Sequence, residues 1–396
     1  MGLNAQEREV LAWLEQQRDA MVELLGLVVN TDSNSYDKPG VDAVLGHFQK
    51  HLEERGLSPQ PIATAPVDSA RFGDCLKTSL PAGDGGAGGE GGKVLLLGHC
   101  DTVFPTGEAA RRPFQVEGDR AYGPGVADMK AGLVMNTFVL EALARFGGAR
   151  HPVTVLYTSD EEIASGASRP VIEAEARGAR AVFNAEPGRP SGNLVSGRKG
   201  AMFLTIEATG VAAHSGVAPE KGKSAIEELC RKVLDLHALT DLETGTTVNV
   251  GLIQGGQSIN TVAPHARARV DVRFRTIAAM EAAEAAIREI VGRTYVQGTT
   301  TRLTEKAMFL PLEETQAGDA LFDHYRGCAR DLGLEPGREY TGGSADSGFT
   351  AAAGAPTLCG TGPVGEKAHS PHEVCHLDTM VPKAQALALA ILRLDR

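Results

Sequence analysis

Five residues of types that bind metal ions are scattered along the chain, each inside a short segment suited to aim its side chain. They are His99, Asp128, Glu162, Glu186 and His369. None belongs to a compact cluster such as C-x-x-C, so the fold must assemble any site that they form. A further carboxylate, Glu161, lies beside one of them. Two metal ions and a free carboxylate are what a protein needs to activate a water molecule.

His99 and Asp101 follow an apolar run at 93–98 that predicts a buried strand. Because side chains alternate along a strand, both should point to the same face. A ligating histidine commonly has a carboxylate behind it that fixes its tautomer, so we expect Asp101 to orient His99. For this motif alone, an ordinary polar contact at a strand end is the simpler interpretation.

Asp128 lies where a Gly/Pro turn at 122–126 leads into a helix expected at 130–146. An N-cap aspartate would suit this place. Its two oxygens can also bridge two cations, which holds them ~3.5–4 Å apart. The spaced glycines do not predict a dinucleotide site, because no apolar strand leads directly into them.

Glu161 and Glu162 follow a strand expected at 152–158, and Glu186 follows another at 180–184. Adjacent side chains diverge, so one of the paired glutamates can bind metal while the other faces the bound water. A solvated acidic loop is the alternative, although the carboxyl ends of strands are where α/β proteins place their sites.

The segment from His372 to His376 matches the H-E-x-x-H zinc motif, which works only on a helix. Pro371 precedes it, and the next helix is expected to start at Asp378. In an extended segment the two histidines lie ~13 Å apart, too far for bonds of ~2.0–2.1 Å to one zinc ion. We therefore favour His369 as the ligand.

The elements that must position these residues alternate between strand and helix, with helices at 130–146 and 168–177. This alternation predicts an α/β fold with a mainly parallel, helix-covered sheet. Apolar residues at helical spacing from Val10 to Val28 predict one N-terminal helix, and a second is expected at 40–56. The glycine-rich stretch at 81–92 lacks the ending of a phosphate loop and indicates a surface hairpin.

A different pattern begins near residue 197. The expected elements are a strand at 200–208, a helix at 222–238, strands at 246–253 and 265–275, a helix at 277–292 and a strand at 299–306. This β-α-β-β-α-β order is ferredoxin-like. Because His369 lies beyond it, we expect one discontinuous domain at 1–196 and 305–396, with a second domain at 197–304 inserted into it.

Composition excludes several classes of protein. A length of 396 residues favours two domains, and a formal charge of -11 argues against nucleic-acid or acidic-membrane partners. The six cysteines have no paired spacing and indicate reduced, mostly buried thiols. No stretch has the ~20 apolar residues that cross a bilayer, nor is there a signal sequence, so we expect a cytoplasmic protein.

Taken in order, the motifs resemble those of the M20 family of di-zinc peptidases and deacylases. They are His99-Cys-Asp-Thr, Gly123-Pro-Gly-Val-Ala-Asp128-Met-Lys, Asp160-Glu-Glu162, Glu186-Pro, a His214 loop and His369-Ser. Within this family the chain is most similar to bacterial glutamate carboxypeptidases of the folate-cleaving type. The resemblance implies a catalytic zinc domain interrupted by a dimerisation or lid domain.

The resemblance also implies roles for individual residues. One zinc ion would be bound by His99 and Glu186, the other by Glu162 and His369, and both by Asp128, with Co²⁺ or Mn²⁺ as substitutes. Glu161 would be the general base. His214 would reach into the site of a partner subunit and stabilise the oxyanion, so a homodimer is expected.

For the substrate, the resemblance implies a polar contact from Asn260 and a carboxylate clamp from Arg273. Gly343 and Ser344 belong to a glycine-rich loop, 341–348, that would line the leaving-group pocket. Ala345 stands where a threonine is common, which bears on the inherited preference for glutamate.

Three functional hypotheses follow. The first is a zinc carboxypeptidase that releases a C-terminal amino acid, glutamate foremost, from a small N-acyl or peptidyl substrate. The second is an N-acyl-amino-acid deacylase of the acetylornithine or succinyl-diaminopimelate kind. The third is a non-catalytic, metal-stabilised binding protein, which would have no need of Glu161.

Overall fold

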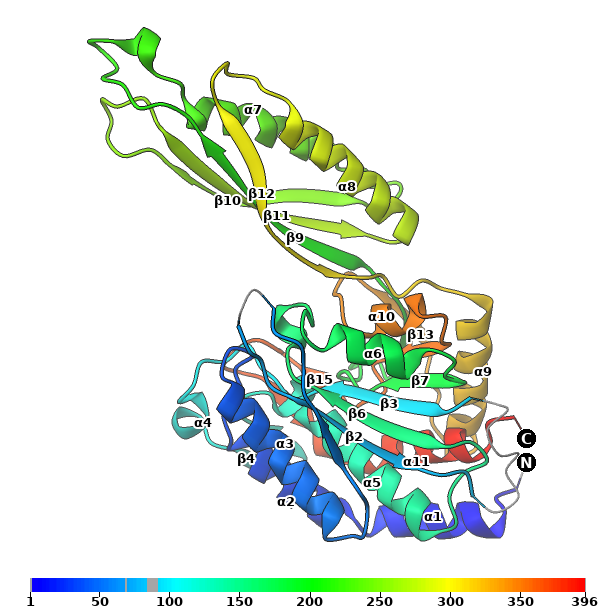
Figure 1. Ribbon diagram of the computed structural model, residues 1–396. Helices are drawn as coiled ribbons and strands as arrows, with labels where there is room; N and C mark the ends of the chain where they lie inside the picture. The colour runs from blue at the N-terminus through cyan, green and yellow to red at the C-terminus, as the bar shows by residue number, and fades with distance from the viewer. Residues whose placement is uncertain (1, 68–69, 84–91, 396) are drawn as a thin grey trace. The chain divides into compact units, whose positions relative to one another are not determined.

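The computed structural model describes residues 2–67, 70–83 and 92–395, which fold into two compact units (Figure 1). The larger unit comprises Met1–Gly197, Glu314–Tyr340 and Phe349–Arg396, and the smaller comprises Arg198–Glu313 and Thr341–Gly348. The sequence predicts a discontinuous α/β unit with an inserted α+β unit, but residues 305–313 and 341–348, which it assigns to the larger unit, belong to the smaller one. Most of the expected hairpin at 81–92 lies outside the described residues.

A mixed sheet forms the centre of the larger unit. Its strands lie in the order β1 (Gln60–Ile62), β2 (Cys75–Leu80), β6 (Val153–Thr158), β3 (Val94–His99), β7 (Ala181–Asn184), β14 (Thr357–Cys359), β8 (Leu194–Arg198) and β13 (Arg338–Thr341). Strand β3 is parallel to both β6 and β7. Every residue of β3 is buried, as its continuous apolar run predicts for a strand covered on both faces. The carboxyl ends of β6, β3 and β7 therefore meet at one edge.

Helices cover both faces of this sheet (Figure 1). On one face α5 (Ala131–Arg145) packs against β3 and β6, and around it lie α1 (Ala5–Glu15), α2 (Arg18–Val29), α3 (Lys38–Glu53) and α11 (Met380–Leu392). The remaining helices are α4 (Glu108–Arg111), α6 (Arg169–Ala176), α9 (Gln316–Arg330) and α10 (Ser347–Ala352). Helix α5 ends at Arg145, and Gly147 and Gly148 follow it with positive φ angles that suit glycine. The Gly148 N–H donates to the Leu143 carbonyl.

The prediction of one N-terminal helix from Val10 to Val28 is wrong. The chain breaks at Gln16 and Gln17, and two helices result. Helix α1 packs against both α11 and α5, whereas α2 packs against α5 and the turn before it. Both halves therefore pack against α5, and the break lets α1 reach α11 as well and α2 reach the turn before α5.

A small sheet joins two segments that are far apart in sequence. It runs β15 (Gly365–Glu366), β16 (Val374–His376), β5 (Arg120–Tyr122) and β4 (Gln115–Glu117), with β16 antiparallel to β5. The chain that carries His369 lies between β15 and β16, and the turn that carries Asp128 follows β5. Pairing of β16 with β5 therefore brings these two segments together.

The smaller unit has the β-α-β-β-α-β order that the sequence predicts. Its elements are β9 (Gly200–Thr209), α7 (Ala225–His237), β10 (Thr247–Gly255), β11 (His265–Phe274), α8 (Ile277–Gly292) and β12 (Thr300–Phe309). The strands are antiparallel in the order β10-β11-β9-β12, and both helices pack on the sheet. Strand β11 alternates between buried and more exposed residues, as expected for a sheet covered on one face.

The cysteines agree with the sequence-based expectation. All six are free thiols, and Cys230 is exposed while the others are buried. Across the described parts of the chain, the helices are too short or too polar to cross a membrane.

Candidate metal centre

Parallel strands and one turn of the larger unit deliver the candidate ligands to a single place. His99 is the last residue of β3, Glu161 and Glu162 follow β6, and Glu186 follows β7. Asp128 comes from the turn before α5. The carboxyl edge of these strands is where the sequence predicts a site.

Two groups of ligand atoms form there, and they share one residue. His99, Asp128 and Glu186 make one group, and Asp128, Glu162 and His369 make the other, with the atoms of each group within 4.8 Å of one another. Asp128 Oδ1 lies 3.3 Å from His99 Nε2, and Asp128 Oδ2 lies 3.3 Å from His369 Nε2. The two oxygens of Asp128 thus face the two histidines separately, as a bridging carboxylate would.

The donor set fits a pair of divalent cations. His99 Nε2 and Glu162 Oε1 are buried and make no hydrogen bond to the described residues. Buried polar atoms normally have a partner, so an orphaned imidazole nitrogen and carboxylate oxygen indicate the place of a further group. Imidazole and carboxylate ligands are those that zinc accepts.

The pKa values show how strongly the site attracts positive charge. Burial alone would lower the pKa of His99, but the neighbouring Glu161, Asp101 and Asp128 outweigh it and raise that pKa well above its usual value. Hydrogen bonds to Asp128 and Glu162 raise the pKa of His369 to about 10. Burial, reinforced by Asp128, raises the pKa of Glu162 to about 7. The raised pKa values therefore indicate that, in the metal-free protein, these side chains tend to hold protons where metal cations would otherwise bind.

Glu161 lies beside both groups and belongs to neither. Its Oε2 is 3.9 Å from His99 Nε2, and the residue is buried. The peptide N–H groups of Glu161 and Glu162 both donate to the Asp101 carboxylate, at 3.1 Å each. That carboxylate also lies 3.3 Å from His99 Nδ1 and accepts from Ser35 at 2.6 Å. Asp101 therefore fixes the histidine and the glutamate pair together.

The backbone at His369 is held in the left-handed region, with φ of 61°. This conformation is uncommon for residues other than glycine, and such residues gather at functional sites. The following segment is extended in β16, His372 is exposed, and His376 bonds Glu366 at 2.8 Å. Neither His372 nor His376 enters either ligand group.

Glu373 is a residue whose part in the site the sequence did not indicate. Its buried carboxylate accepts hydrogen bonds from the N–H groups of Gly125, Ala127 and Asp128, at 3.1, 2.8 and 2.9 Å. It therefore holds the turn that presents Asp128. The sequence did contain one indication of this residue: Glu373 lies four residues after His369, inside the H-E-x-x-H match that we rejected as a zinc motif.

Other predicted site residues lie in the smaller unit and form two groups there. At one end of β9, Ser215 N bonds the Asn260 carbonyl at 3.0 Å, which joins the His214 and Asn260 segments. At the other end, Arg273 donates to Ser344 Oγ at 3.3 Å, and Arg198 donates to the Gly343 carbonyl at 3.4 Å. Arg273 also pairs with Asp271 at 2.7 Å.

Comparison with known proteins points to one family. The family described as Peptidase family M20/M25/M40 matches residues 95–393. Carboxypeptidase G2 of Pseudomonas sp. (strain RS-16) is 29% identical over 361 residues, 89% of this chain and 84% of that protein. Acetylornithine deacetylase of Proteus mirabilis (strain HI4320) is 30% identical over 273 residues, 64% of this chain and 66% of that protein.

A solved structure agrees at the level of the fold. The M20 family metallo-carboxypeptidase Sso-CP2 from Sulfolobus solfataricus superposes with a TM-score of 0.73 at 17% identity. The match covers 94% of this chain and 99% of that one. Likeness at this level of identity concerns the arrangement of elements, including the inserted unit.

We expect removal of the Glu373 carboxylate to weaken metal binding. Glu373→Ala leaves three buried N–H groups without an acceptor, and loss of a group that orients a ligand typically lowers metal affinity about 10- to 100-fold. Zinc affinity is measured by competition with a chromogenic chelator. Glu373→Gln, which keeps an acceptor oxygen, should lie between Ala and wild type.

Glu366→Gln is the matched control, because Glu366 belongs to the same small sheet but bonds His376 instead of the Asp128 turn. Its zinc affinity should equal that of wild type. Equal affinity of Glu373→Ala and wild type would show that the turn holds Asp128 without this carboxylate.

We also expect zinc binding to release protons and to tighten as pH rises from about 7 towards 10, since metal ligands must be deprotonated. His369, with its pKa raised to about 10, holds a proton across this range in the metal-free protein. Calorimetric titration of metal-free protein with zinc, in buffers of different ionisation enthalpy, counts the protons released. His369→Asn should release about one fewer than wild type, and the exposed control His372→Asn the same number. An unchanged count in His369→Asn would contradict this assignment.

Proposed function

The chain belongs to peptidase family M20/M25/M40, and we propose that it cleaves an amide bond to release a C-terminal amino acid, glutamate foremost, from a small N-acyl or peptidyl substrate. Membership makes it a hydrolase of a metal-dependent family. The observation that carries the proposal is the pair of ligand groups sharing Asp128, with the buried Glu161 beside them.

The metal ligands are proposed as the sequence assigns them. His99 and Glu186 would hold one ion, Glu162 and His369 the other, and Asp128 both. Zinc is the proposed metal, with Co²⁺ or Mn²⁺ as substitutes. When bound, the two ions would polarise the scissile carbonyl and lower the pKa of water.

The remaining chemistry falls to the protein's own groups. Glu161 would take a proton from the attacking water as the water oxygen forms the new bond to the carbonyl carbon. As the C–N bond breaks, Glu161 returns that proton to the leaving nitrogen. Asp101 keeps His99 oriented through Nδ1 and positions Glu161 through its backbone N–H. Burial of both carboxylates limits competing contacts with water.

Arg273 is the proposed clamp for the substrate carboxylate, with Ser344 and Gly343 beside it. A cationic setting supports this role. Burial lowers the pKa of Lys199, and Arg275 and Arg273 lower it further, because these positive groups lie close together. Asp271 occupies part of the Arg273 fork, so a substrate carboxylate would compete with it. Arginine can hold a carboxylate through two parallel hydrogen bonds.

His214 and Arg273 cannot serve one small substrate from the same copy of the smaller unit. Arg273 pairs with Ala201 at the start of β9, whereas the His214 loop follows the end of that strand. Eight residues of strand at ~3.3 Å each separate the two ends by roughly 26 Å. We infer that His214 acts, with Asn260, in the site of a partner subunit, where it would stabilise the oxyanion.

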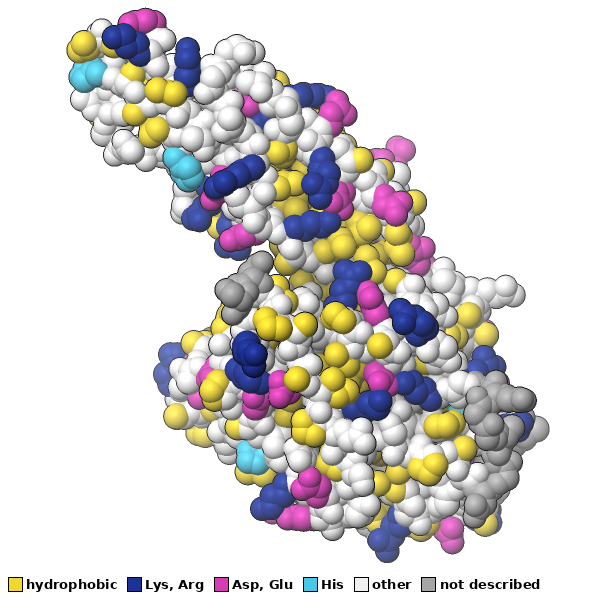
Figure 2. Space-filling model, in the orientation of Figure 1, with side chains coloured by type: hydrophobic (Ala, Val, Ile, Leu, Met, Phe, Trp, Pro, Cys, Tyr) yellow, Lys and Arg dark blue, Asp and Glu magenta, His cyan; other side chains and the backbone are white. Residues whose placement is uncertain are grey.

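The surface of the smaller unit supports a homodimer. Strand β10 is at an edge of its sheet, and it exposes Leu252 and Ile253. Large exposed hydrophobic residues of the described chain concentrate on this unit: Val211, Val217, Ile226, Leu234, Leu242, Leu252, Ile253 and Ile259. Figure 2 shows hydrophobic side chains on one face of it. An exposed apolar edge strand is a template for pairing with another chain.

A deacylase remains the second candidate, because acetylornithine deacetylase is among the similar proteins. Ala345, which is buried, stands where the glutamate carboxypeptidases commonly carry threonine. The same metal centre would serve both reactions, since both hydrolyse an amide next to an amino-acid residue.

The choice can be tested with zinc-loaded protein and a panel of amides: folate-type and other N-acyl-glutamates, N-acetylornithine and N-succinyl-diaminopimelate. We expect selective release of glutamate. Loss of a general base typically lowers the reaction rate about 10²–10⁴-fold. The rate of hydrolysis by Glu161→Gln should therefore fall at least that far, while the variant still binds zinc. Turnover of only the other amides would assign the protein to the deacylases, and inertness of wild type on the whole panel would favour a binding protein.

The role of His214 can be tested by mixing two inactive variants, His214→Ala and Glu161→Gln. If His214 acts across subunits, a mixed dimer holds one complete site. Random exchange of equal amounts should then restore about a quarter of wild-type activity, because half of the dimers are mixed and each has one working site of two. If His214 acts within its own subunit, mixing restores nothing.

A further inference from the structure

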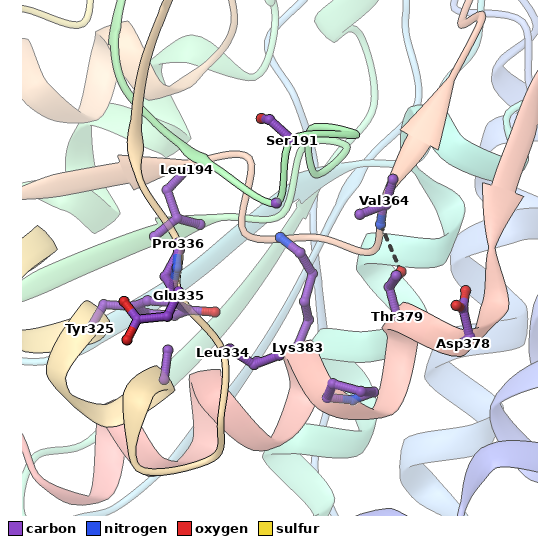
Figure 3. A pocket seen from close by; sticks show the side chains of 13 residues that line it. Ser191, Leu194, Tyr325, Leu334, Glu335, Pro336, Val364, Asp378, Thr379 and Lys383 are labelled. Atoms are coloured by element: carbon purple, nitrogen blue, oxygen red, sulfur yellow. Dashed lines mark hydrogen bonds between the residues drawn. The ribbon is translucent and has the colours of Figure 1, made fainter.

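The larger unit contains a pocket between α9, α11 and the start of β8. Its volume is about 350 Å³, within the range of small-molecule sites. The apolar part of its wall comes from Leu194, Tyr325, Leu334, Pro336 and Val364. None of the metal-ligand candidates lines it. Figure 3 shows Lys383 extending from α11, with Leu194, Tyr325, Leu334 and Pro336 on one side of it and Val364 on the other.

Lys383 is an unusual residue for an apolar wall. Its side chain is more than nine-tenths buried, and its Nζ donates one hydrogen bond, to the Gly360 carbonyl at 3.2 Å. Among the described residues no carboxylate forms an ion pair with it. An ammonium group has three donors, so this one bond leaves most of its capacity unused. A buried charge without a partner is costly, and proteins usually pair it.

The setting keeps the amine in place. A Cβ atom on Gly188 would lie 2.7 Å from Lys383 Nζ, so the end of the lysine rests against the backbone at Gly188. Burial lowers the pKa of Lys383 to about 8, and the amine is therefore still mostly charged at neutral pH. An anion bound beside it would offset the cost of that burial.

We propose that this pocket binds a small monocarboxylate with an apolar body, whose carboxylate pairs with Lys383. The apolar wall would cover the body of the ligand, and the lysine supplies the single positive charge. Thr379, whose hydroxyl already donates to the His376 carbonyl and accepts from Val364 N, lies on the same wall.

The acidic residues of the wall do not neutralise Lys383. Glu335 is exposed and pairs with Arg330 at 2.8 Å, and Asp378 is exposed to solvent. Their charges are screened by water, whereas the buried lysine is not. They would nevertheless disfavour ligands with several negative charges, which is why the proposal specifies one carboxylate.

The test uses zinc-loaded protein and 4-phenylbutyrate as the probe, with binding followed by isothermal titration calorimetry. The neutral amide of the same acid is the ligand control. Because a charged hydrogen bond contributes about 1.5–3 kcal/mol, Lys383→Met should weaken binding about 10- to 100-fold, and the amide should bind wild type correspondingly less well.

Two further variants keep the test decisive. Leu334→Trp puts a larger side chain into the pocket and keeps the lysine, and it should abolish binding even if Lys383→Met does not fold. Lys50→Met removes an exposed lysine of α3 and should bind the probe as wild type does. Absence of binding at millimolar probe, or equal binding by wild type and Leu334→Trp, would overturn the proposal. Equal binding by these two proteins would mean that the carboxylate of the probe binds elsewhere, for example at the metal centre.

Discussion

Mutual repulsion among buried carboxylates is the constraint on which the larger unit depends. Asp101, Glu161 and Glu186 are almost wholly buried within reach of His99, and Asp128, which is partly buried, lies beside them. Negative charges that lie this close together and this far from water cannot all persist without compensating cations. The hydrogen bonds to Asp101 and the raised pKa values of both histidines supply part of that compensation. Divalent metal, whose use membership of the family implies, would supply the rest.

Building that cluster requires ligands from distant parts of the chain, and the fold meets this requirement with two devices. Adjacent parallel strands align the residues after β3, β6 and β7 at one edge. The small sheet then brings the His369 segment to the Asp128 turn. Glu373 fixes this turn by accepting hydrogen bonds from its backbone N–H groups. His99 ends β3, and Glu162 and Glu186 come directly after β6 and β7, so the buried sheet sets the positions of these three residues.

The sequence predicts those parts of the structure that depend on local pattern. The apolar run before His99 gives β3, and the change of pattern near residue 197 gives the β-α-β-β-α-β unit. Features that depend on tertiary packing are not predictable in this way. The break at Gln16 and Gln17 lets two helical halves that both pack against α5 reach different further neighbours. Glu373 could not be assigned, since an acceptor for the turn of Asp128 lies about 245 residues away along the chain.

The division of residues between the two units bears on how specificity is set. The candidate ligand groups and Glu161 all belong to the larger unit, so the metal centre itself does not draw on the sequence of the smaller one. Arg273, Ser344, Asn260 and His214 belong to the smaller unit, where substitutions leave the carboxylate cluster untouched. One metal centre can therefore serve hydrolases with different substrates, and likeness at that centre identifies the reaction more firmly than the substrate. For this chain, the discriminating contacts must be sought around Arg273 and the loop at Ala345.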